Sequence, residues 1–175
     1  MRTRMLHLLI KPASSLCNLH CRYCFYCDVA ENRNTLSYGI MEPQTVDALL
    51  KQSFAYATGP VTFSFQGGEP TMAGLRYFAD FCAKIPRYNT ESLPVQLALQ
   101  TNGYILDDDW YAFLAEHRFL VGVSLDGTAR LHDANRVNAA GEGTFSVVRD
   151  AIRRLKAHGV DTNILCVVTD ALARH

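Results

Sequence analysis

Apolar residues recur along the chain in two alternating patterns. Short runs rich in β-branched and aromatic residues, such as VTFSF at 61–65, are typical of buried strands. Longer stretches, such as 43–56, repeat apolar residues at the spacing of one helix face. These patterns predict strands at 6–11, 61–65, 95–100, 119–125 and 160–168, and helices at 43–56, 75–85, 107–116 and 144–158.

Helix-breaking residues separate several of these elements. Gly59-Pro60 ends the first helix, Pro86 is predicted to end the helix over 75–85, and Gly159 is a suitable C-cap for the last one. Strands that alternate with helices over short distances favour an α/β fold with a parallel sheet, either doubly wound or part of a barrel. The chain stops at His175 soon after a strand, with no predicted helix to cover it, so we expect a truncated protein.

Polar, glycine-rich segments follow the predicted strands. Because the carboxyl ends of parallel strands meet at the same edge of a sheet, these segments should converge on one active site. They are residues 17–27, 66–71, 100–103 and 124–127.

Charge and hydropathy exclude several functional classes. Lys plus Arg and Asp plus Glu each number 17, so the net charge gives no indication of nucleic-acid binding or of a basic membrane-binding surface. No apolar run approaches the roughly 20 residues of a transmembrane helix. The N-terminal apolar run contains His7 and stops at Lys11-Pro12, which is too short for a signal peptide. We therefore expect a cytoplasmic protein.

The cysteines are clustered. Four of the six lie between Cys17 and Cys27, which favours a metal site over a disulfide framework. The spacing C-x3-C-x2-C of Cys17, Cys21 and Cys24 suits a cuboidal 4Fe–4S cluster with three protein ligands. The fourth iron would then be open to an exogenous ligand, as in catalytic metal sites. Such a loop would leave the cluster exposed to oxygen.

Two other metal sites are compatible with these cysteines. A zinc site could use Cys17, Cys21, Cys24 and Cys27, although zinc modules usually split their ligands into two separated pairs. A ferredoxin-like cluster could also take Cys27 as its fourth ligand. The remaining Cys82 and Cys166 are expected to be buried as small hydrophobic residues.

The cysteine motif, with Tyr23 before its last cysteine, resembles the signature of radical S-adenosylmethionine (SAM) enzymes. The later segments resemble further motifs of that superfamily in the same order: QGGEPT at 66–71, QTNG at 100–103, SLDG at 124–127 and the D-x-x-R segment at 133–136. Phe25-Tyr26 and Phe65-Gln66 look most like the anaerobic sulfatase-maturating enzymes, which carry an additional SPASM-type cluster domain. The resemblance spans nearly the whole chain.

The resemblance implies a partial (β/α)6 barrel, with residues 1–175 as a radical SAM catalytic domain that is incomplete at its C-terminus. Cys17, Cys21 and Cys24 would hold the cluster, whose open iron would chelate SAM. An electron from a reduced flavodoxin or ferredoxin would then cleave SAM to a 5′-deoxyadenosyl radical. That radical would take a hydrogen from a Cys or Ser of a sulfatase, which a second oxidation converts to Cα-formylglycine.

The resemblance also implies roles for individual residues. Glycines at the end of a strand let backbone approach the SAM amino group closely, and an arginine fork suits its carboxylate. The expected cofactor contacts are Tyr23, Gly67, Gly68, Glu69, Ser124 and Arg136, and the expected substrate-facing residues are Tyr26 and Gln66.

Each assignment has a structural alternative. The Gly-Gly-Glu-Pro run could be an ordinary turn, Arg136 a surface ion pair, and Tyr23 and Tyr26 packing residues. Gln66 could make a strand-end hydrogen bond. Asn102 and Asp126 are expected to support the site or a turn, without a catalytic role.

This sequence departs from the family pattern because it ends before the last barrel strand is complete. The SPASM-type cysteines and the aspartate that serves the family as general base would lie beyond residue 175, so we expect this chain to hold most of the SAM site without completing turnover. Two other functions stay open. One is a radical SAM maturase of another ribosomal peptide, for example a thioether-forming enzyme, and the other is a non-catalytic zinc-binding module.

Overall fold

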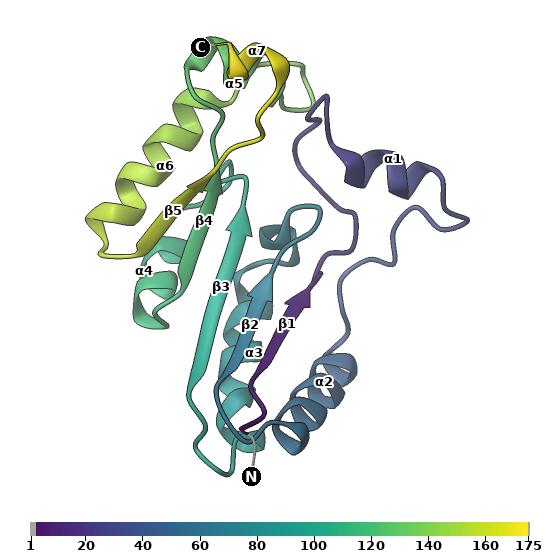
Figure 1. The fold of residues 1–175 in the computed structure, drawn as a ribbon, viewed down its shortest axis with the longest axis vertical. Helices are drawn as coiled ribbons and strands as arrows, with labels where there is room; N and C mark the ends of the chain where they lie inside the picture. The colour runs from purple at the N-terminus through teal and green to yellow at the C-terminus, as the bar shows by residue number, and fades with distance from the viewer. Residues whose placement is uncertain (1–2, 175) are drawn as a thin grey trace.

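Five parallel strands form one sheet in the computed structural model, which describes residues 3–174 (Figure 1). The strands follow one another across the sheet in the order of the sequence, so each consecutive pair is joined by a crossover on one side. They are β1 (Leu6–Ile10), β2 (Val61–Phe65), β3 (Val95–Thr101), β4 (Leu120–Ser124) and β5 (Asp161–Leu165). All five predicted strands are confirmed, with small differences at their ends.

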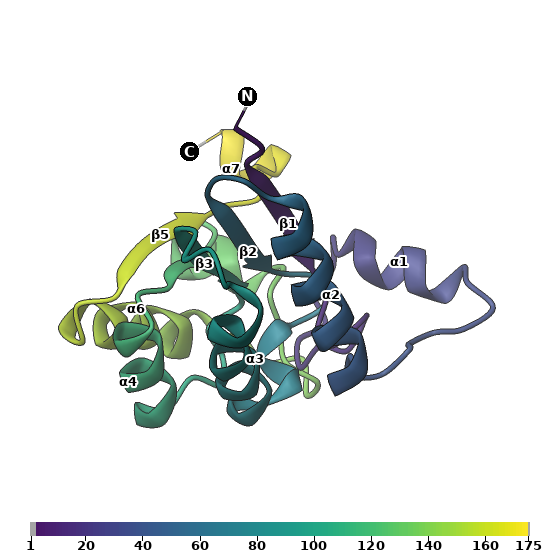
Figure 2. The ribbon, with the colours of Figure 1, turned by 90° about the horizontal axis from the view of Figure 1, so that it is seen from below.

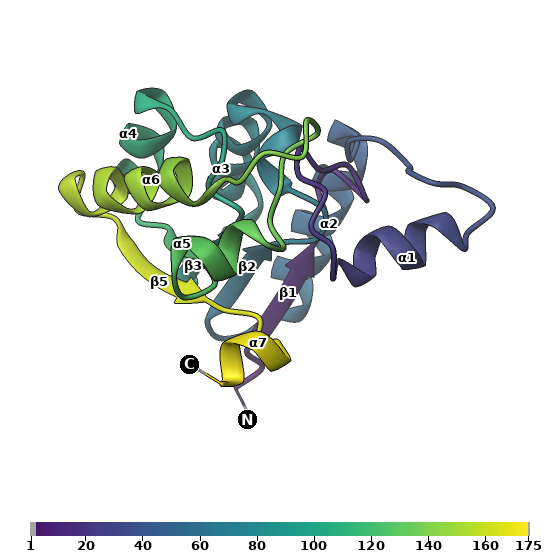
Figure 3. The ribbon, with the colours of Figure 1, turned by 90° about the horizontal axis from the view of Figure 1, so that it is seen from above.

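The four predicted helices cover one face of this sheet, as the views along it show (Figures 2 and 3). They are α2 (Pro43–Tyr56), α3 (Leu75–Tyr88), α4 (Asp108–Glu116) and α6 (Phe145–Ala157). Short helical segments that the apolar pattern did not predict lie in the connections: α1 (Phe25–Glu31), the 3-10 turn η1 (Pro70–Ala73), α5 (Ala129–Asp133) and α7 (Asp170–Ala173). Over residues 3–174, no helix is long and apolar enough to cross a bilayer.

Strand alternation separates the two faces of the sheet. In β2, Val61, Phe63 and Phe65 are buried while Thr62 and Ser64 are partly exposed. The register aligns Phe63 with Leu8 and Leu97 of the neighbouring strands, which continues the apolar surface beneath the helices. The opposite face carries polar side chains with hydrogen bonds between His7 and Ser64 and between Thr62 and Gln96, beside the exposed apolar residues Leu9 and Leu120.

The helix predicted over 75–85 does not end at Pro86. It continues to Tyr88, and the backbone N–H of Asn89 closes it on the carbonyl of Ile85 at 2.9 Å. A proline removes one hydrogen bond to the carbonyl four residues earlier. Here that carbonyl belongs to Cys82. Pro86 itself lies in the last turn of the helix, so only this one hydrogen bond is lost and the last turn still forms.

The chain after the last strand, β5, differs from the prediction in two ways. α7 follows β5 after a short loop, although no helix was expected there, and it is only four residues long. Cys82 is buried, as predicted, whereas Cys166 is exposed, so that prediction was wrong. Cys166 is exposed because it directly follows β5, which lies at the edge of the sheet. Its neighbours are exposed as well, Ile164 of β5 by 53% and Val168 after the strand by 72%.

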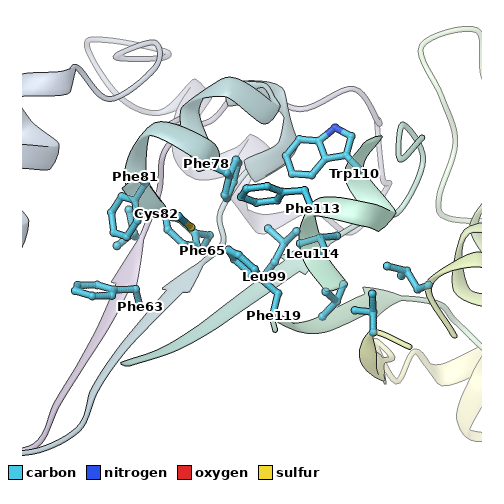
Figure 4. Close-up of a cluster of buried hydrophobic side chains, with 14 of the residues drawn as sticks. Phe63, Phe65, Phe78, Phe81, Cys82, Leu99, Trp110, Phe113, Leu114 and Phe119 are labelled. Carbon is cyan, nitrogen blue, oxygen red and sulfur yellow. The ribbon is translucent and has the colours of Figure 1, made fainter. Parts of the chain in front are cut away.

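An aromatic cluster fills the space between the sheet and the helices (Figure 4). Phe65 of β2 lies near its centre, with ring centroids 4.9 Å from Phe78 and 5.0 Å from Phe81 of α3. Both pairs meet edge to face, which is a favourable aromatic geometry. Phe78 in turn contacts Trp110 of α4 at 5.2 Å, so the cluster joins two helices to the strand that leads into the Gly-Gly-Glu-Pro segment.

We predict that Phe65→Ala lowers the free energy of unfolding by about 3–5 kcal/mol, because it leaves a cavity among aromatic rings. Urea unfolding followed by circular dichroism measures this change. Phe25→Ala is the matched control, since Phe25 is 64% exposed and an exposed substitution should cost roughly 0.5 kcal/mol or less. An equal decrease in the free energy of unfolding in the two variants would contradict a core built around Phe65.

Candidate active site

A cavity of about 250 Å³ opens at the carboxyl ends of the strands. Its wall combines the cysteine loop, the segments after β2, β3 and β4, and two residues from further along the chain, Arg136 and Val167. The predicted convergence of the four polar segments is therefore confirmed. Every site residue predicted from the sequence lines this cavity: Cys17, Cys21, Tyr23, Cys24, Tyr26, Gln66, Gly67, Gly68, Glu69, Ser124 and Arg136.

The cysteine loop is held by backbone pairing to the segment at 135–138. The N–H of His20 donates to the carbonyl of Val137 at 2.8 Å, and the N–H of Arg22 donates to that of Asn135 at 2.9 Å. Leu19, only 3% exposed, precedes these contacts and bridges to Asn138. The segment at 135–138 lies in the connection between α5 and α6, so residues more than a hundred positions away fix the loop.

The three motif cysteines line one cavity, and three thiolates of one loop are a donor set that suits a 4Fe–4S cluster. Burial raises the pKa of Cys17 to about 11, and burial also raises the pKa of Cys21, so both are neutral thiols until a metal binds. Among the side chains that the structure describes (residues 3–174 apart from Asp28 and Glu31), no group of three Cys, His, Asp or Glu is placed to hold one metal ion. Thiolates of a 4Fe–4S cluster bind different irons and need not converge on one point.

Cys27 is exposed on α1 and is not part of the cavity wall. The set of cysteines facing the cavity is therefore Cys17, Cys21 and Cys24.

The two glycines after β2 pack against the segment that leads from β1 into the cysteine loop. Gly68 has φ +55°, and a Cβ at this position would lie 2.4 Å from the carbonyl oxygen of Leu16. The next residue donates its N–H to that same oxygen, at 2.7 Å. At Gly67, φ is +84° and a Cβ would meet the side chain of Lys11 at 2.6 Å. Both positions therefore require glycine.

Glu69 is fully buried and satisfied by the protein. One carboxylate oxygen accepts hydrogen bonds from the N–H and hydroxyl of Thr71 and from the hydroxyl of Thr101, at 2.8–3.0 Å. The other accepts the N–H of Asn102 at 2.7 Å. Burial raises the pKa of this carboxyl, and the four donors oppose that rise. The side chain thus joins the loop after β2 to the end of β3.

Asp126, at the end of β4, forms the second buried charge cluster. It accepts hydrogen bonds from Arg136 Nε at 2.9 Å, from the Tyr23 hydroxyl and from the N–H of Val167 at 3.0 Å. Burial alone would raise the pKa of Asp126, but Arg136 and the other donors outweigh it and hold the pKa below its usual value. Because Tyr23 belongs to the cysteine loop, this cluster ties that loop to β4 and β5.

The remaining wall carries uncharged polar and aromatic groups. Gln100 Nε2 donates to Ser124 Oγ at 3.1 Å, which leaves the serine hydroxyl proton free to point elsewhere. The Lys11 ammonium lies 4.2 Å from the centroid of the Tyr26 ring. Sequence reasoning did not assign the cavity-lining residues Phe25, Gln100, Thr101 and Val167, although Gln100 and Thr101 belong to a segment that it singled out.

Comparisons with known proteins agree with this geometry. The sequence model of the Radical SAM superfamily matches residues 12–171. Over 170 residues, the chain is 47% identical to a cysteine-type anaerobic sulfatase-maturating enzyme of Clostridium perfringens, covering 97% of this chain and 46% of that protein. A serine-type enzyme of Klebsiella aerogenes is 36% identical over 169 residues, covering 97% of this chain and 41% of that protein.

Solved structures give the same result. Native anSMEcpe with bound AdoMet superposes with a TM-score of 0.93 at 47% identity, covering 97% of this chain and 46% of that one. A second structure, native anSMEcpe with bound AdoMet and Kp18Cys peptide, has a TM-score of 0.93 at 45% identity over 98% of this chain and 46% of that chain. The chain thus spans less than half the length of these relatives. It belongs to the radical SAM superfamily, whose members use a 4Fe–4S cluster and SAM.

Proposed function

We propose that this chain is the SAM-cleaving part of an anaerobic sulfatase-maturating enzyme, which oxidises a Cys or Ser of a sulfatase to Cα-formylglycine. One observation carries the proposal. The cysteine triad and all the predicted cofactor and substrate residues line a single cavity at the strand ends, in a chain that is 47% identical to a cysteine-type enzyme of that class.

Cys17, Cys21 and Cys24 hold the 4Fe–4S cluster in this proposal. When bound and reduced, such a cluster would supply the electron for cleavage of SAM into methionine and a 5′-deoxyadenosyl radical. The protein contributes placement and electrostatics around this cofactor chemistry. Tyr23 contributes by joining the cysteine loop to Asp126, and its backbone is proposed to contact the adenine.

The SAM amino acid group is proposed to lie between the ends of β2 and β4. Ser124 receives its hydrogen bond from Gln100, so its own proton is available to the SAM carboxylate. Arg136 uses Nε and Nη2 on Asp126 and retains other N–H groups for that carboxylate. The glycines at 67–68 bring backbone towards the SAM amino group, and the bonded Glu69 carboxylate keeps that loop rigid.

The substrate side of the cavity is proposed to involve Tyr26 and Gln66. Both line the same cavity as the cysteines and Ser124. Lys11, which covers Gly67 and contacts the Tyr26 ring, would contribute a positive charge beside the peptide. The general base and a SPASM-type cluster domain are expected in the part of the relatives' length that this chain does not span.

The overall oxidation removes two electrons from the target residue. The 5′-deoxyadenosyl radical would take one hydrogen atom from Cβ. The second electron would pass to an iron–sulfur cluster of the SPASM-type domain, and loss of the hydroxyl proton would then give the aldehyde directly from a serine. A cysteine would instead give a thioaldehyde, which water would hydrolyse to the aldehyde and hydrogen sulfide. We propose that flavodoxin or ferredoxin donates the first electron, and that the protein acts in the cytoplasm.

The activity is tested by anaerobic incubation of the protein with SAM, a reductant and sulfatase-derived peptides that carry either Cys or Ser at the target position. Mass spectrometry of the peptide measures its oxidation, and chromatography of 5′-deoxyadenosine measures SAM cleavage. Formylglycine in either peptide supports the proposal and identifies the accepted residue. Formation of 5′-deoxyadenosine with both peptides unmodified would point to another peptide substrate, such as the precursor of a thioether product.

The ligand set gives a second prediction. We expect Cys17→Ala to lose the cluster and all SAM cleavage, because only two thiolates would remain. Cys27→Ala is the matched control, since Cys27 lies outside the cavity wall, and it should keep wild-type iron and sulfide. Iron and sulfide analysis after anaerobic reconstitution measures both. Loss of iron in Cys27→Ala would contradict the three-cysteine set, and zinc without sulfide in the wild type would show a zinc module.

The Asp126 cluster gives a third prediction. We expect Asp126→Asn to lower the free energy of unfolding by about 3–5 kcal/mol, because Arg136 would remain buried without its counter-charge. Asp170→Asn is the control, as its pair with Arg174 is largely exposed, with side chains 87% and 76% accessible, and should cost at most about 1 kcal/mol. Urea unfolding compares the two. A similarly small decrease in the free energy of unfolding in both variants would mean that the Asp126 charge is not needed to stabilise buried Arg136.

A further inference from the structure

We propose that Asn102 donates a hydrogen bond to the sulfur of Cys17 and thereby makes the cluster easier to reduce. This inference rests on the proposed ligation by Cys17. It assigns a positioning role to a residue of the QTNG segment, which the proposed function leaves unused. Asn102 lines the cavity, is 8% exposed, and has its Nδ2 atom 3.8 Å from Cys17 Sγ.

The side chain of Asn102 has its other hydrogen-bonding groups occupied. Its Oδ1 accepts the N–H of Tyr104 at 3.0 Å, which fixes which end of the amide is the donor. Its Nδ2 donates to Asn18 Oδ1 at 2.8 Å. An amide nitrogen carries two N–H groups. With one of them on Asn18, the second is directed to the sulfur of Cys17.

The backbone of Asn102 is equally fixed. Its N–H donates to the buried carboxylate of Glu69 at 2.7 Å, and the same carboxylate holds the hydroxyl of Thr101. Glu69 is 1% exposed, so this contact lies away from water. The donor to Cys17 is therefore preorganised by groups from the end of β2 and from the cysteine loop.

Asn18 supports the same interpretation. Its oxygen accepts from Asn102, while its own Nδ2 is buried without a hydrogen-bond partner in the protein. A buried donor without a partner is unfavourable. Only the oxygen of the Asn18 amide is satisfied, and its partner is Asn102, which fits a role in orienting Asn102.

Cys17 receives a second N–H group, from the backbone of Leu19 at 3.5 Å. Hydrogen bonds to the sulfurs of an iron–sulfur cluster are among the factors that set its reduction potential. Reduction adds negative charge, part of which falls on the thiolates, and N–H donors stabilise the more negative state. The low dielectric around the half-buried sulfur strengthens this effect. Since reduction precedes SAM cleavage, Asn102 acts on the first electron-transfer step.

The test is electron paramagnetic resonance of the reconstituted protein poised at a series of solution potentials. Losing one hydrogen bond should lower the ratio of reduced to oxidised cluster at a fixed potential by roughly two- to tenfold in Asn102→Ala. Asn102→Asp should lower it further, because it also adds negative charge. Gln96→Ala is the matched control, since Gln96 is an exposed amide at the opposite end of β3.

Iron and sulfide contents separate the possible outcomes. A wild-type protein that assembles no cluster would overturn the proposed function itself. A wild-type cluster with an unchanged ratio in Asn102→Ala would overturn the role of Asn102 alone. If both Asn102 variants fail to bind iron, Asn18→Ala decides: it keeps the Asn102 amide but removes one of its partners. A smaller shift in the same direction supports the proposal, and no shift overturns it.

Discussion

The parallel register of the sheet is the constraint on which the rest of the structure depends. Because β1 to β5 run in the same direction and pair in sequence order, the segments that follow them all emerge at one edge. The aromatic cluster around Phe65 fixes the helices against this sheet, and so holds the strand ends in place. A slip of one residue in β2 would turn Phe63 and Phe65 to the polar face and move the Gly-Gly-Glu-Pro segment away from the cysteine loop.

Two buried carboxylates convert this arrangement of strand ends into a rigid cavity. Glu69 joins the loop after β2 to the end of β3, and Asp126 joins the end of β4 to Tyr23, Arg136 and the chain after β5. Burying a carboxylate is unfavourable unless hydrogen bonds or a counter-charge compensate it. Both carboxylates are compensated, Glu69 by four neutral donors and Asp126 by a guanidinium. Each therefore acts as a fixed joint between segments that are distant in the sequence.

Both buried carboxylates, Glu69 and Asp126, help to hold the cysteine loop in place. Its backbone pairs with the segment at 135–138, its Tyr23 bonds to Asp126, and its Cys17 lies beside Asn102, which Glu69 holds. A cluster bound to such a loop would have its electronic environment set by groups from three strands.

The sequence by itself determined the five strands, the four long helices, the three cysteines as candidate metal ligands and most residues of the cavity, because periodicity, spacing and ordered motifs are local properties. It did not determine that the α3 helix continues past Pro86, that Cys166 is exposed, or that the Arg136 guanidinium pairs with the Asp126 carboxylate. Nor did it reveal the contact of Asn102 with Cys17. Each of these depends on which distant groups become neighbours, and therefore on burial and hydrogen-bond partners that only the packed tertiary structure decides.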